Sequence, residues 1–124
     1  MRTVLVADDD RDIRDLVAFK LEQAGYRVLR AADGAEALRM ATADPPDIAI
    51  LDLMMPAVSG IDVCRALREQ DETAHVPVIL LTARAQERDV QHGFASGADD
   101  YVTKPFSPRE LASRVQAVLA RARG

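Results

Sequence analysis

Three carboxylates stand side by side in the stretch VLVADDD, where Asp8, Asp9 and Asp10 follow an apolar run. Two ionised carboxylates about 6 Å apart repel by roughly 2–3 kcal/mol at an effective dielectric of about 20, which is a large share of the stability of a small domain. We therefore expect a positive group close to these carboxylates, which offsets their repulsion.

Three more polar side chains come directly after apolar runs elsewhere in the chain. Asp52 ends DIAILD, Thr82 ends PVILLT, and Lys104 follows DYVT. If these runs are parallel strands, their carboxyl ends lie along one edge of a sheet, where such folds place ligands. We therefore expect these three side chains to meet Asp8 and Asp9 in one crevice.

This expected cluster predicts a particular chemistry. Carboxylates alone, without nitrogen or sulfur ligands, suit a hard divalent cation, and we assign Mg²⁺ because it keeps open positions for phosphate oxygens. Lys104 and Thr82 would complete a clamp around a phosphoryl group, whose transfer depends mostly on positioning and charge neutralisation. Asp52 is the candidate acceptor, because the end of a buried strand holds a nucleophile rigidly and the loop DLMMPAVSG can admit a donor.

The elements that must position these residues alternate along the chain. Short apolar runs predict strands, and apolar residues at helical spacing predict helices, with capping signals at Asp33, Ser59 and Ser107. The weakest helical pattern is the fourth, because Gly93 interrupts it. The predicted strands are 3–7, 26–31, 47–52, 77–82 and 100–103, and the predicted helices are 11–24, 34–43, 60 to about 69, 86–95 and 108 to about 121.

Five strands that alternate with five helices predict an α/β fold. Because the strands are apolar on both faces, the sheet should be parallel and covered by helices on both sides. Right-handed crossovers favour the (βα)5, flavodoxin-like strand order 2-1-3-4-5. Residues 1–124 fit one domain, with no internal repeat and no linker.

Composition narrows the class of protein. Hydrophobic residues make up 48% of the chain, which is typical of a globular protein. The net charge of −4 argues against a nucleic-acid surface. The longest uncharged apolar stretches are too short for a membrane span, and an acid at position 8 argues against a secretory leader, so we expect no membrane contact and a cytoplasmic location. The single Cys64 is expected to be a buried small side chain, and His75 and His92 surface or loop residues.

The stretches VLVADDD, DLMMP, LLTA and GADDYVTKPF occur in this order and at separations that resemble the receiver domain of two-component response regulators, over essentially all 124 residues. The resemblance implies phosphoryl transfer to Asp52 from a phosphohistidine of a sensor histidine kinase or phosphotransfer protein, for signalling to an output domain or target protein. It also implies that Asp9 and Asp52 bind Mg²⁺ directly, that Asp8 binds it through water, and that the backbone carbonyl of Met54 is a further ligand.

The resemblance extends to the parts that respond to phosphorylation. Thr82 and Lys104 correspond to the pair that contacts the phosphoryl oxygens, and Tyr101 matches the switch aromatic of the family. The Lys104–Pro105 pair resembles the site of the family's cis peptide bond. The face made by the fourth helix, the fifth strand and the fifth helix is then expected to change shape on phosphorylation.

Other readings of the same residues remain open. Aspartates after a strand often only cap a helix, as expected for Asp10, while Thr82 could be a plain strand residue and Lys104 a solvated charge. A flavin-binding module of the same fold is disfavoured, because the loop DDDRD lacks the glycines and hydroxyls that bind a flavin phosphate. A phosphorylation-independent protein-interaction domain of this fold is the remaining alternative.

Receivers of the DNA-binding winged-helix class pair through salt bridges on the face just described. Val90 and Gln116 stand where that class usually has basic residues, so only half of the pattern is present. We expect a monomer or a weak dimer. The acidic and basic residues that fit the pattern are Asp99, Asp100, Glu110 and Arg114.

Overall fold

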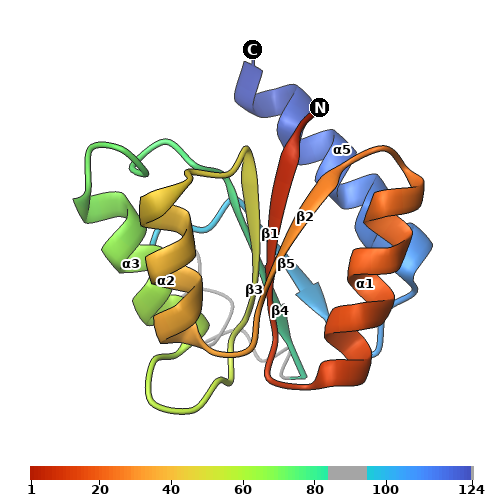
Figure 1. Ribbon diagram of the computed structural model, residues 1–124, viewed down its shortest axis with the longest axis horizontal. Coiled ribbons are helices and arrows are strands. Elements are labelled where there is room, and N and C mark those ends of the chain that lie inside the picture. Colours follow the sequence, from red (N-terminus) through yellow and green to blue (C-terminus); the bar gives the residue numbers. More distant parts are fainter. Residues whose placement is uncertain (84–94, 124) are drawn as a thin grey trace.

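A computed structural model of the chain describes residues 1–83 and 95–123 (Figure 1). Its centre is a five-stranded parallel sheet in the order β2-β1-β3-β4-β5, which confirms the predicted topology. Each predicted strand is present, with its start moved by one residue in three of the five. The strands are β1 (Thr3–Ala7), β2 (Arg27–Ala31), β3 (Ile48–Asp52), β4 (Val78–Thr82) and β5 (Asp100–Thr103).

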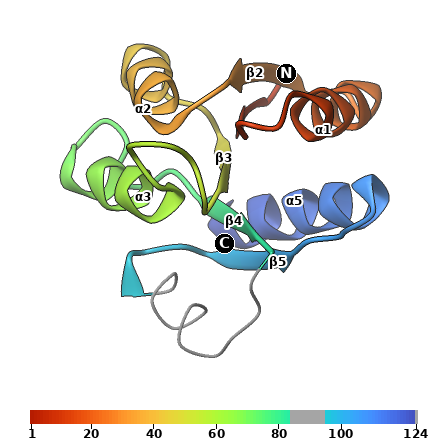
Figure 2. The same cartoon turned by 90° about the horizontal axis from the view of Figure 1, so that it is seen from below.

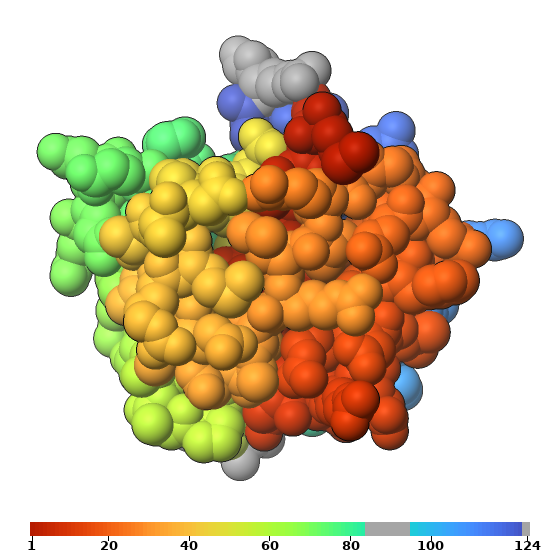
Figure 3. Space-filling model, in the orientation of Figure 1, coloured from red at the N-terminus to blue at the C-terminus, as the bar shows by residue number. Residues whose placement is uncertain are grey.

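Helices cover both faces of this sheet. Figure 2 shows α2 and α3 on one side and α1 and α5 on the other. The space-filling view shows α1, β2 and α2 closing over the β2 side of the molecule (Figure 3). Residues 84–94, which include all but the last residue of the predicted fourth helix 86–95, lie outside the described residues. The helices are α1 (Arg11–Gln23), α2 (Gly34–Ala43), α3 (Gly60–Glu69) and α5 (Pro108–Arg123).

Side-chain caps set where the helices begin. The carboxylate of Asp10 accepts hydrogen bonds from the backbone N–H groups of Asp12 and Ile13, at 2.9 and 3.2 Å, so α1 starts directly after the acidic stretch. The hydroxyl of Ser107 accepts from the N–H of Glu110 at 3.0 Å and caps α5 in the same way. These bonds satisfy donors that a helix leaves unpaired in its first turn. The predicted capping roles of Asp10 and Ser107 are thus confirmed.

The core has two layers because successive residues of a strand point to opposite faces. Every residue of β3 and β4 is buried, as expected for strands covered on both sides. Leu5, Leu51 and Leu80 face α2 and α3, whereas Val6, Ile50 and Ile79 face α1 and α5. Cys64 lies fully buried in the first of these layers, as predicted. Among the described helices, none combines the length and the apolar character that crossing a membrane requires.

The register of the sheet brings the strand ends together. Ala7 pairs with Leu51, and Asp52 follows it at the end of β3. Thr82 pairs with Thr103, directly before Lys104. The polar residues that end these strands or directly follow them therefore share one edge of the sheet.

Candidate functional site

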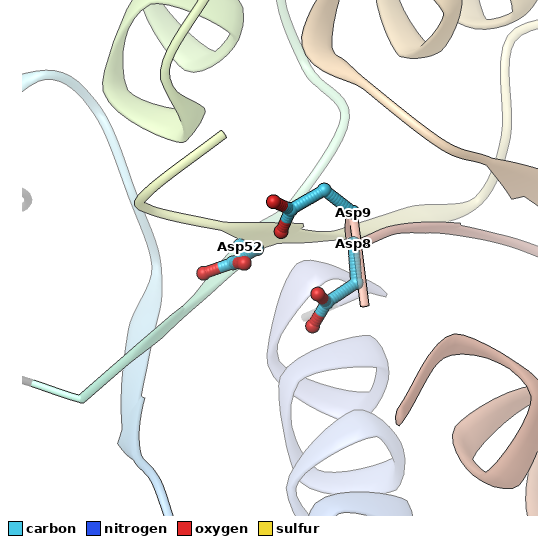
Figure 4. A group of neighbouring side chains, drawn as sticks. All are labelled: Asp8, Asp9 and Asp52. Carbon is cyan, nitrogen blue, oxygen red and sulfur yellow. The ribbon is translucent and has the colours of Figure 1, made fainter. Parts of the chain in front are cut away.

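The three predicted acidic ligands meet at this edge. One carboxylate oxygen of each of Asp8, Asp9 and Asp52 lies within 4.8 Å of the other two. Figure 4 shows the three side chains gathered where β1 and β3 end. Asp8 and Asp52 are buried, and Asp9 is exposed at the rim. The cluster therefore has two fixed members and one that faces solvent.

Lys104 supplies the positive group that the repulsion calls for. Its Nζ lies 3.1 Å from Oδ2 of Asp8 and 3.4 Å from Oδ2 of Asp52. Burial lowers the pKa of Lys104, but the hydrogen bond to Asp8 and the charges of both carboxylates outweigh it and raise that pKa. The lysine thus stays charged and bridges the two buried acids.

The carboxyl group of Asp52 has a raised pKa. Burial, followed by the nearby charge of Asp8, raises its pKa from 3.8 to about 6, although Lys104 and the backbone N–H of Met54 act in the opposite direction. That N–H donates to Oδ1 of Asp52 at 3.3 Å. Because burial disfavours the ionised form of this carboxyl group, a second positive charge nearby would stabilise that form strongly.

Asp8 is held by main-chain and side-chain partners together. Its Oδ1 accepts from the backbone N–H of Asp10 at 2.9 Å, and its own N–H donates to the carbonyl of Ala31 at 3.2 Å. The guanidinium of Arg14 donates to the carbonyl oxygen of Asp8 at 3.0 Å. Sequence reasoning missed Arg14; the available signal was a basic residue in the first turn of the helix that follows the acids.

Thr82 and Lys104 are joined through the main chain. The N–H of Lys104 donates to the carbonyl of Thr82 at 2.6 Å, and Thr82 is fully buried at the end of β4. The Lys104–Pro105 peptide is cis, as the resemblance implied. The predicted hydroxyl and the predicted ammonium therefore leave adjacent strands at neighbouring points of the same edge.

Tyr101 and Met54, the two other residues to which the sequence analysis gave a role, lie in different environments. Tyr101 lies on β5 opposite Leu80 and is partly buried against the core layer under α2 and α3. Met54 is 57% exposed, while Met55 is buried in the core layer under α2 and α3. The ligand role of the Met54 carbonyl and the switch role of Tyr101 stay predictions.

Residues of the predicted pairing face are engaged within the chain. Arg114 lies 3.2 Å from Asp100 and 3.8 Å from Glu110. Asp99 accepts from the N–H of Val78 at 2.8 Å and from the guanidinium of Arg68 at 3.1 Å. Val90 lies outside the described residues. The charges predicted for an intermolecular contact thus have internal partners.

The donor chemistry of the site fits a divalent cation. Among the described residues, three carboxylates face the ammonium of Lys104, which leaves excess negative charge. All three acids offer oxygen, the ligand atom that Mg²⁺ prefers. One acid is exposed, so an ion can reach the cluster from solvent. Asp8, Asp9 and Asp52 are the residues that could hold it.

Comparison with known proteins gives a consistent result. The family model described as the response regulator receiver domain matches residues 4–116. The chain is 49% identical over 121 residues to the DNA-binding dual master transcriptional regulator RpaA of Synechocystis sp., covering 98% of this chain and 50% of RpaA. It is 47% identical over 120 residues to the alkaline phosphatase synthesis transcriptional regulatory protein PhoP of Bacillus subtilis, covering 97% and 49%. The chain thus spans about half the length of these curated relatives.

Solved structures agree with the fold. The chemotaxis protein CheY4 of Vibrio cholerae superposes with a TM-score of 0.91 at 38% identity, covering 95% of this chain and 98% of that one. A putative response regulator from Chloroflexus aurantiacus gives a TM-score of 0.91 at 39% identity, covering 97% and 98%.

Proposed function

Because this chain belongs to the family of response regulator receiver domains, we propose that it accepts a phosphoryl group on Asp52 in a reaction that requires Mg²⁺. The donor is a phosphohistidine of a sensor histidine kinase or of a phosphotransfer protein. The observation that carries this proposal is the convergence of Asp8, Asp9, Asp52 and Lys104 at one partly buried edge.

In the proposed reaction a carboxylate oxygen of Asp52 attacks the phosphorus of the donor. An O–P bond forms, the N–P bond of the phosphohistidine breaks, and its electron pair stays on the imidazole nitrogen. The Met54 N–H holds one oxygen of Asp52 and thereby orients the other. Rigid placement of a nucleophile is a main source of rate in reactions with little covalent assistance from the protein.

The remaining residues neutralise charge. Mg²⁺, held directly by Asp9 and Asp52, through water by Asp8 and by the carbonyl of Met54, would offset the negative charge of the phosphoryl oxygens. Lys104 lies 3.4 Å from Oδ2 of Asp52, which supports a role in binding a phosphoryl oxygen. The Thr82 hydroxyl would bind a second.

The output follows from the added charge. A phosphoryl group adds about two negative charges at the end of β3, enough to bias a packing equilibrium by a few kcal/mol. We infer that Thr82, Tyr101 and the Lys104–Pro105 turn respond, and that the face formed with β5 and α5 signals to an output domain or target protein. Action in the cytoplasm, as a monomer or weak dimer and without direct nucleic-acid binding by residues 1–124, belongs to the same proposal.

The test uses acetyl phosphate as a small donor, with Mg²⁺ and intact-mass measurement. The proposal expects one phosphoryl group on the wild type, none in Asp52→Asn, and none when a chelator removes the metal. A phosphorylation-independent interaction domain would show no uptake in any of these samples.

A further inference from the structure

Arg14 lies outside the motifs that predicted the site, yet it contacts the site's main chain. Its guanidinium reaches back from the first turn of α1 and donates to the carbonyl oxygen of Asp8 at 3.0 Å. We propose that Arg14 is a positioning residue that holds Asp8 in its orientation toward Asp9 and Asp52, so that cation affinity depends on it. The inference rests on the proposed function, since it concerns the same Mg²⁺ site.

The local geometry explains why such a residue is needed. Asp8 follows the last residue of β1, and its N–H still bonds to Ala31 beside it. Its carbonyl comes where the chain turns away into α1, and a partly buried carbonyl that lacks a donor is costly. Arg14 supplies that donor with a full positive charge, which makes the hydrogen bond stronger than a neutral one.

The hydrogen bond from Arg14 to Asp8 matters most when Lys104 leaves Asp8 to bind a phosphoryl oxygen. Lys104 now holds Oδ2 of Asp8 at 3.1 Å, but in the proposed function it binds a phosphoryl oxygen instead. The bond between Arg14 and the Asp8 carbonyl does not compete with that step. Together with the N–H of Asp10 on Oδ1, Arg14 then keeps the carboxylate in place.

Two roles for this arginine predict opposite results. If Arg14 acted only as a nearby positive charge, its removal would strengthen cation binding, because like charges repel. If it positions Asp8, its removal weakens binding, as losing a partner behind a metal ligand generally does. The sign of the change therefore separates the two roles.

The experiment compares Arg14→Met with Arg14→Lys and with Arg11→Met. Arg11 is the matched control, because it lies in the same first turn, pairs with Asp15 at 3.7 Å, and has an 83% exposed side chain. Calorimetric titration with Mg²⁺ is expected to show about tenfold weaker binding for Arg14→Met, partial recovery in Arg14→Lys, and unchanged or slightly tighter binding for Arg11→Met. Binding by Arg14→Met as tight as that of the wild type, or tighter, overturns the proposal.

A second readout needs no metal. In chelator, amide exchange of Arg14→Met is compared with that of the wild type by NMR. Exchange in the variant should be faster at Asp10, whose N–H bonds to Asp8. It should be unchanged at Glu36, whose N–H bonds to Asp33 at another helix start. Equal acceleration at both amides would mean that Arg14 only stabilises the whole fold, and would overturn the proposal. Wild-type protein that binds no Mg²⁺ would overturn the proposed function as well, whereas normal wild-type binding with an unaffected Arg14→Met overturns this inference alone.

Discussion

The ammonium of Lys104 lies 3.1 Å from Oδ2 of Asp8, although 96 positions separate the two residues. The contact joins the end of β1 to the turn after β5, across the strands β3 and β4. It also reaches Asp52 at 3.4 Å. One partly buried positive charge therefore compensates two buried carboxylates, and what each group does to the stability of the fold can be tested.

Lys104→Met should destabilise the metal-free protein by about 3 kcal/mol, because it leaves two buried carboxylates without their partner. Denaturant unfolding in chelator measures this loss. Mg²⁺ should restore part of it, since the ion neutralises the same acids. Lys20→Met removes the only other lysine and should change stability by less than about 0.5 kcal/mol; an equal loss in both variants would contradict the role assigned to Lys104.

The raised pKa of Asp52 predicts a pH-dependent stability. Between its unfolded value near 3.8 and its folded value of about 6, the native state binds more protons than the unfolded state, so stability falls as the pH rises through this window. Asp52→Asn removes this cost and should be about 2 kcal/mol more stable than the wild type at pH 7.5 in chelator. Denaturant unfolding at pH 7.5 and pH 4.5 should show the advantage shrinking at the lower pH. A variant less stable than the wild type at pH 7.5 would refute an upward shift of the Asp52 pKa.

Asp9→Asn should separate stability from cation binding. Asp9 is exposed at the rim and carries one of the three charges. Its neutralisation should leave the metal-free protein equally or slightly more stable, while the rise in melting temperature caused by Mg²⁺ largely disappears. Asp71→Asn, in an exposed loop, serves as the control and should keep the full Mg²⁺ effect. An undiminished Mg²⁺ effect in Asp9→Asn would remove Asp9 from the ligand set.

Gly60→Ala should displace the backbone of Asp52, the proposed acceptor. A Cβ at this first residue of α3 would collide with the backbone carbonyl of Asp52, so helix and strand must move apart. We expect a loss of about 2 kcal/mol, typical of overpacking, together with slower phosphoryl uptake. Gly25→Ala is the comparison, because its φ of 98° is strained for alanine but its Cβ would meet open space. Slower uptake in Gly25→Ala to the same extent would show that lost stability alone explains the effect.

Local signals in the sequence were enough for most of the fold. The alternation of apolar runs and helical patterns predicted a parallel sheet covered on both sides, because strands buried on both faces need helices on both sides. Right-handed crossovers then favoured the strand order that the structure has. The caps at Asp10, Ser59 and Ser107 were found because a capping side chain bonds to an N–H two or three residues away. The acidic site was predicted because the carboxyl ends of parallel strands meet at one edge of the sheet, whichever side chains they carry.

Contacts that depend on long side chains were not predicted. Arg14 folds back six residues to the Asp8 carbonyl. Arg68 leaves α3 and bonds to the carbonyl oxygens of Val76, at 2.6 Å, and Gly97, at 2.7 Å. Either arginine could equally have extended into solvent, because the rotamer is decided by carbonyls whose positions the sequence pattern does not give.

The most direct test of the account locates the phosphoryl group itself. Protein phosphorylated with acetyl phosphate and Mg²⁺ is treated with borohydride, which reduces an acyl phosphate to an alcohol and so converts the modified aspartate to homoserine. Tandem mass spectrometry then reads the position of the change. The account predicts homoserine at residue 52 and nowhere else; homoserine at residue 8 or 9, with Asp52 intact, would contradict it.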